Sequence, residues 1–253
     1  MNRKISFDCV VAWWLGLSDE QKSAFGDDTT KVAAFLDARA KEIEENTFVI
    51  HLLDKEAIQF LIQHKGYISY KAQAIVKAWR KYAILMGYNG PVAWKVKQGF
   101  TLKTHAPLAG PCYENLEYLQ NWRFEDTSTL DTLVFWIPRL VHNSMSKTVT
   151  EMEQYRGELQ VHYEMPTNHC ISFGSIALQF ALLLTHFKRT GERVLPGGFY
   201  MVSDTLNLDG SCRLVAGNFG SDGLSCYDWN GSCGSHDVGF FLIGIEEFKP
   251  VES

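Results

Sequence analysis

The chain has 253 residues, of which 46% are hydrophobic and 21% are charged, so it is long enough for one large domain or two ordinary ones with a buried core. Its net charge of −5, with no basic cluster beyond "FKRTGER", excludes a dedicated nucleic-acid-binding protein, which carries a basic patch or stripe. No apolar run is as long as a membrane span, and no signal peptide is recognisable. We therefore expect no membrane insertion, and a chain that works in the cytoplasm or as part of a virion or surface assembly.

The first half of the chain has the apolar spacing of helices. Residues 29–45, 54–64 and 70–88 each place apolar side chains three and four positions apart, which is the period of one helix face. Gly87 ends the last of these segments, as glycine often does at a helix C-terminus. The sequence therefore predicts a mainly helical N-terminal region over residues 1–127.

The pattern changes near residue 128. The run "TLVFWIP" is apolar and β-branched and ends at a proline, which is typical of a buried strand. Two helices follow, and we expect Ser172 to cap the second, which is apolar almost all round and therefore central to a core. The strings "GFYMVS", "CRLVAG", "GLSCYDW" and "VGFFLIGIEEF" then predict strands. This order predicts an α+β domain over residues 128–253 whose first and last strands pair. Its expected core includes Phe135, Phe180, Leu183, Trp229 and Phe240.

A long window near the C-terminus has an unusual composition. Residues 204–245 contain no Lys, Glu, Gln, Met or Pro and are rich in Gly, Ser, Asn and Asp. Turns favour those four residue types, so a loop-rich surface is one explanation. A second explanation is genetic. Randomising both adenines of an Asn codon, AAY, gives NNY, which cannot encode Lys, Glu, Gln, Met or Trp. Between Asn218 and Asp237 only Trp229 falls outside the NNY set, so Trp229 is expected to be a fixed scaffold residue.

Several strings together resemble a known family. They are "GPVAWKVKQGFTLKTHAPLAGPCY", "LVFWIPRL", "SFGSIAL", "THFKRTGERV", "CRLVAG" and "VGFFLIGIE", spread over roughly residues 87–248. On these residues the chain resembles the variable proteins of diversity-generating retroelements, in the branch found in uncultured bacteria, archaea and their viruses. The first eighty or so residues carry none of the resemblance.

The resemblance implies a C-type lectin fold in the C-terminal half, with a variable region at about residues 204–245 that binds a protein or other macromolecular ligand. The constant residues Leu214, Leu224, Phe240 and Phe241 are then expected to face inward, with Cys226 in the fixed frame. The N-terminal region is expected to dock the module on a larger assembly. The positions that the family varies fall here on Asn218, Phe219, Ser221, Asp222, Ser225, Tyr227, Asn230, Ser232, Cys233, Ser235, His236 and Asp237. Their side chains are expected to face solvent, and the aromatic ones, at positions 219 and 227, are the expected binding anchors.

Two alternatives remain from the residues alone. Cys226 and Cys233, with His236 nearby in sequence, allow an enzyme on a related fold that uses paired cysteines. A calcium-dependent carbohydrate-binding lectin is the other, with ligands drawn from Asp204, Asp209, Asp222, Asp228 and Asp237. No family signature surrounds the cysteines and no calcium-loop spacing fits the aspartates. The prediction is therefore a binding protein that is not an enzyme and carries no metal or cofactor.

Overall fold

The structure is a computed structural model that describes residues 31, 47–119 and 127–247. The chain divides between Thr47 and Phe48 into two compact units, and the helices and strands that follow belong to the unit that begins at Phe48. The helix predicted at residues 29–45 lies outside the described residues, apart from Lys31, which is helical.

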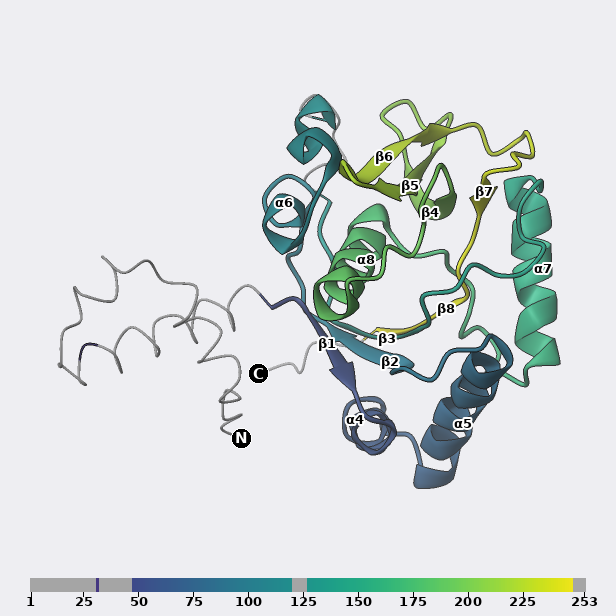
Figure 1. Ribbon diagram of the computed structural model, residues 1–253. Helices are drawn as coiled ribbons and strands as arrows, with labels where there is room; N and C mark the ends of the chain where they lie inside the picture. Colours follow the sequence, from purple (N-terminus) through teal and green to yellow (C-terminus); the bar gives the residue numbers. More distant parts are fainter. Residues whose placement is uncertain (1–30, 32–46, 120–126, 248–253) are drawn as a thin grey trace. The chain divides into compact units, whose positions relative to one another are not determined.

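This unit is mixed α and β, and its last five elements are all strands (Figure 1). In chain order the elements are β1 (Val49–Leu52), α4 (Asp54–Lys65), α5 (Ser69–Leu85), β2 (Ala93–Val96), α6 (Ala106–Ala109), η1 (Tyr113–Leu119), β3 (Thr132–Trp136), α7 (Val149–His162), α8 (Ile176–Thr190), β4 (Tyr200–Leu206), β5 (Arg213–Gly220), β6 (Gly223–Trp229), β7 (Val238–Gly239) and β8 (Ile243–Glu247).

The first sheet has the strand order β1-β2-β3-β8, with every pair antiparallel. Its strand β3 pairs with β8 through Trp136 and Ile243, so the predicted pairing of the first and last strands of residues 128–253 is confirmed. Both faces of β3 are buried, which explains its continuous apolar sequence. Phe135 packs on one face with helix α5, and Trp136 packs on the other with helix α8.

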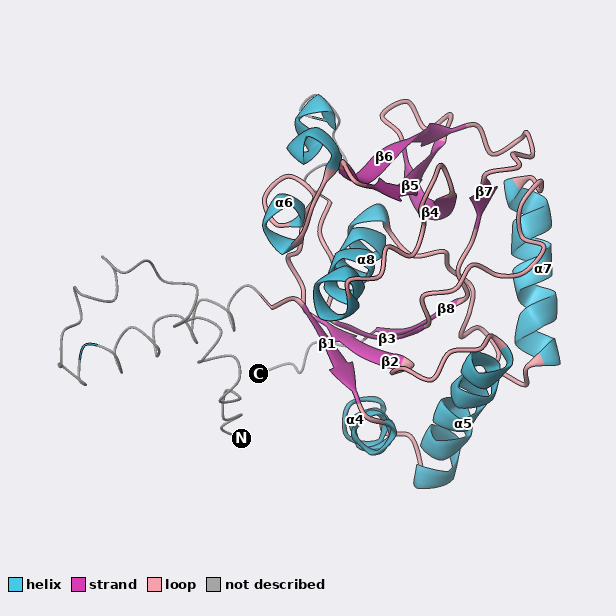
Figure 2. Cartoon of the chain, in the orientation of Figure 1, coloured by secondary structure: helices cyan, strands magenta, loops and turns pink. Residues whose placement is uncertain are grey.

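The second sheet has the order β6-β5-β4-β7, and β7 runs parallel to β4. Helix α8 lies between the two sheets (Figure 2) and is buried almost all round, as its composition predicts. The predicted core residues Phe135, Phe180, Leu183, Trp229 and Phe240 are all buried. The closing segment "VGFFLIGIEEF" forms two strands instead of one, since its start joins the second sheet as β7 and its end joins the first as β8.

The cap predicted for helix α8 is wrong by one turn. Ser175 is the N-cap, and its Oγ accepts a hydrogen bond from the backbone N–H of Leu178 at 3.2 Å. Ser172 instead donates to the carboxylate of Asp204 on β4, at 2.5 Å. Two serines three residues apart compete for the cap, and the one with extended backbone geometry directly before the first helical residue takes it.

The predicted boundary at residue 127 does not match the compact unit either. Strands β1 and β2 belong to the N-terminal region of the prediction, yet they complete the sheet of β3 and β8. The region is helical in α4 and α5, but it also carries half of this four-stranded sheet. Its helices contribute to the core that Phe135 and Trp229 share, so residues from Phe48 onward form one unit.

Candidate functional site

Strands β5 and β6 form a hairpin at the edge of the second sheet, and an irregularity in it decides which side chains face outward. The register of the pair shifts between Gly217 and Gly220, and Asn218 there has a positive φ of 46°. Leu214 and Ala216 face the core on alternate positions, so unbroken alternation would bury residue 218. The bulge instead leaves Asn218 exposed and turns Phe219 inward.

The expectation that Phe219 faces solvent as a binding anchor is therefore wrong. Its ring is fully buried and lies 5.1 Å from the ring of Phe187 on helix α8. Its backbone N–H donates to the carbonyl oxygen of Leu195 at 2.7 Å, which fixes the bulge from the core side.

The other predicted binding residues are all exposed or half-buried, and we call them the candidate surface: Asn218, Ser221, Asp222, Ser225, Tyr227, Asn230, Ser232, Cys233, Ser235, His236 and Asp237. The first three lie around the end of the β5–β6 hairpin, the next two along β6, and the rest in the loop that leads to β7. Between them the chain places buried side chains, namely Leu224, Cys226 and Trp229. The inward orientation expected for Leu224 and Trp229 is confirmed, and Cys226, expected in the fixed frame, is buried beside them.

Several glycines beside or between the candidate positions have no room for a side chain. A Cβ at Gly217 would lie 2.2 Å from the carbonyl oxygen of Phe199, and one at Gly223 would lie 2.5 Å from the carbonyl carbon of Cys112. In the loop, a Cβ at Gly231 would meet the side chain of Val149 at 2.3 Å. These distances are well inside van der Waals contact, so glycine is required at all three positions.

The loop between β6 and β7 is held by its backbone. Its carbonyl oxygens at Gly231 and Ser235 accept from the N–H groups of Val149 and Ser146, at 2.9 and 2.7 Å. The carbonyl of Asp237 accepts from the N–H of Tyr200 at 2.8 Å, which ties the loop to β4. These bonds need no particular side chain in the loop, so its anchoring to neighbouring elements does not depend on the residues that it displays. Within the loop, Asn230 Oδ1 also accepts from the N–H of Ser232 at 3.0 Å.

An aromatic pair connects strands β4 and β6 across β5. The rings of Tyr227 and Tyr200 lie 4.4 Å apart, edge to face, on adjoining parts of the outer face of the sheet. Burial, then the neighbouring Tyr200 and Asp237, raises the pKa of Tyr227, so its hydroxyl stays protonated and able to donate. Sequence reasoning missed Tyr200 and the exposed Phe199, because both precede the depleted window and share none of its composition.

The structure does not favour the paired-cysteine alternative. Cys226 packs in the core with Leu224, whereas Cys233 is exposed in the loop, and both thiols are free. Burial, then the nearby Asp228, raises the pKa of the Cys226 thiol. A nucleophilic cysteine requires the opposite shift and access to substrate.

The aspartates of the calcium alternative are engaged separately. Asp204 accepts from the backbone N–H groups of Phe173 and Gly174 and pairs with Arg213 at 3.2 Å. Asp209 accepts from Ser211 within its own turn. Within residues 47–119 and 127–247, no three His, Cys, Asp or Glu side chains are arranged to hold a metal ion.

Among the described helices, none combines the length and apolar composition needed to cross a bilayer. No protein-family model matches the chain. Searches of curated proteins and of solved structures likewise found no match.

Proposed function

We propose that the chain is a hypervariable ligand-binding protein, diversified by a retroelement, that binds a protein or other macromolecule through the candidate surface. One observation carries the proposal. Positions expected to vary, Phe219 apart, are exposed or half-buried, while Leu224, Cys226 and Trp229 between them are buried, and Gly223 and Gly231 are too crowded for a side chain. Random changes at the first set leave the core intact, which a diversified binding site requires.

The proposed scaffold is a C-type lectin fold. Three features support it: the pairing of β3 with the C-terminal strand β8, the two intervening helices α7 and α8, and a second small sheet that bears the candidate surface. The half-buried Tyr227 and the polar Ser, Asn and Asp groups around it have the chemistry of antibody paratopes, in which rigid aromatics and adaptable polar groups share the contacts.

Sequencing of the gene and its flanks in related genomes tests the proposal. The proposed function predicts a near-copy of the codons for residues 218–237, with AAY at the candidate positions, beside a reverse-transcriptase gene. It also predicts that alleles differ at the codons for the candidate surface and not at those for Leu224, Cys226 or Trp229. Variation spread evenly over buried and exposed codons would contradict it.

A further inference from the structure

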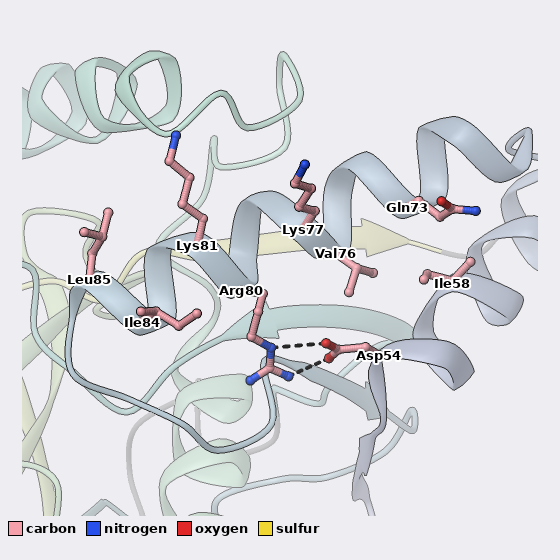
Figure 3. Close-up of a pocket in the computed structure, with 9 residues that line it drawn as sticks. All are labelled: Asp54, Ile58, Gln73, Val76, Lys77, Arg80, Lys81, Ile84 and Leu85. Carbon is pink, nitrogen blue, oxygen red and sulfur yellow. Dashed lines mark hydrogen bonds and ion pairs between the residues drawn. The ribbon is translucent and has the colours of Figure 1, made fainter.

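Helices α4 and α5 enclose an open groove of about 650 Å³ (Figure 3). Ile58 of α4 and Val76 of α5 form its apolar floor. The ion pair of Arg80 with Asp54 closes one side, with two contacts of 3.1 and 2.5 Å, and a second hollow of about 480 Å³ lies beyond it.

The groove exposes large apolar side chains on a helix face that contacts solvent, where polar side chains are usual. Ile84 and Leu85 line it and are 60% and 62% exposed. The residues that α5 contributes recur every three or four positions from Gln73 to Leu85, so they form a stripe about 18 Å long at 1.5 Å per residue. That length matches about three turns of a partner helix laid between α4 and α5.

The charges around the groove run against those of the whole chain. The net charge of the chain is −5, yet five basic residues line the two hollows against one acidic residue, Asp54. Lys77 has no ion-pair partner within the described residues, and Lys81 makes only an exposed pair with Glu164, at 3.8 Å. Exposed pairs of this kind contribute little stability, so both ammonium groups are available to a partner.

We propose that the α4–α5 groove docks an acidic amphipathic helix of a partner protein. Its apolar face covers Val76, Ile84 and Leu85, and its flanking carboxylates pair with Lys77 and Lys81. A second copy of this chain is a poorer occupant, since its own helix α5 carries lysines where the groove favours acids. Opposite charge steers such a helix into the groove and sets its orientation.

Helices α4 and α5, which form the groove, lie at the end of the unit away from the β5–β6 hairpin, with the first sheet and α8 between them (Figure 1). A partner in the groove therefore leaves the candidate surface open. The inference stands on the groove alone and does not depend on the proposed function.

Fluorescence anisotropy with the full chain tests the docking site. The probe is a labelled synthetic helix of about four turns, with Leu along one face and Glu on both flanks; a second peptide carries Lys in place of Glu. The acidic peptide should bind more tightly, and added salt should weaken it. The double variant Lys77→Glu/Lys81→Glu should lower its affinity about fivefold to tenfold, which is about 0.5–0.7 kcal/mol for each of the two exposed pairs.

Lys188→Glu is the matched control, because this exposed lysine lies on α8 outside the groove. It should leave the affinity unchanged. Equal binding of the acidic and basic peptides to the unaltered chain overturns the proposal. This comparison does not depend on whether any variant folds. So does a double variant that binds as tightly as the unaltered chain. Sedimentation showing a dimer that Ile84→Ser dissociates would place a second copy in the groove and also overturn it.

Discussion

At the scale of single residues, burial distinguishes binding positions from scaffold positions that residue type alone does not distinguish. Asn218 and Phe219 are neighbours with NNY-compatible codons, so sequence treats them alike. The bulge at Asn218 exposes one side chain and buries the other. A change of register within a strand leaves no signal in the residue types themselves, which is why the prediction for Phe219 failed.

Phe219→Ala should lower the free energy of unfolding by about 3–5 kcal/mol, because it leaves a cavity beside Phe187. Phe199→Ala is the matched control, since Phe199 is the same residue type but 40% exposed. It should cost less than about 1 kcal/mol. Chemical denaturation measures both. Equal losses would show that Phe219 is not a core residue.

A buried hydrogen-bond network of Trp79, His169 and Glu246 should make the free energy of unfolding depend on pH. Trp79 Nε1–H donates to His169 Nε2 at 2.9 Å, so the proton of the neutral ring lies on Nδ1, which is 3.0 Å from Glu246. Burial alone would raise the pKa of Glu246, but the hydrogen bond from His169 and the nearby Lys65 hold it below the usual range.

The folded-state pKa of Glu246 is depressed, so its contribution to stability is present above the unfolded value of about 4.3 and is lost as pH falls below it. Glu246→Gln should cost about 1–3 kcal/mol at pH 7, and less at pH 3. Denaturation at both pH values measures this, with the exposed Glu158→Gln as control. A deficit that does not shrink at pH 3 contradicts the assignment.

At the scale of elements, periodicity predicted the long helices and missed the short strands. Helices α4, α5 and α8 have enough turns to display an apolar face, and glycines at 66 and 191 end two of them in left-handed geometry. Strands β1 and β2 have four residues each, too few to show alternation beside neighbouring helices. Strand β2 forms because β3 offers it an edge, and β1 pairs in turn with β2; neither pairing is visible from the residues of these two strands.

Glycines in the β5–β6 hairpin should differ sharply in tolerance. Gly217→Ala should destabilise by about 1–3 kcal/mol, because its methyl group meets the backbone of β4. Gly220→Ala is the control: the nearest atom to its Cβ is 3.9 Å away and its φ is not positive, so little change is expected. Thermal melts of both variants measure the difference. Similar melting temperatures would contradict the close approach of β4 and β5 at Gly217.

At the scale of the whole molecule, the sequence predicted a mixed α and β unit and the pairing of its outer strands, but placed its start too late. The family resemblance begins near residue 87, so it gave no reason to include β1 and helix α4. The extent of the unit follows from sheet pairing over long sequence separations, which local pattern does not report.

Truncation tests the extent of the unit. Residues 48–253 should unfold cooperatively, since they contain both sheets and their core. Residues 128–253 should aggregate or lack a sharp transition, because the loss of β1, β2 and α5 exposes Leu133 and Phe135 and a bare edge of β3. Calorimetry of the two fragments measures this. A sharp transition for the shorter fragment would restore the later boundary.

Two libraries test whether the displayed positions are separate from the structural ones. One randomises the candidate surface with NNY codons; the other randomises Gly217, Leu224, Cys226, Trp229 and Gly231 in the same way. Display on yeast with a protease challenge scores folding of each member.

Most members of the first library should fold, since substitutions of exposed residues usually change the free energy of unfolding by no more than about ±0.5 kcal/mol each. Asn218 should favour Asn, Asp and Gly there, because its φ is positive. Few members of the second library should fold. A first library that folds as rarely as the second would contradict the account.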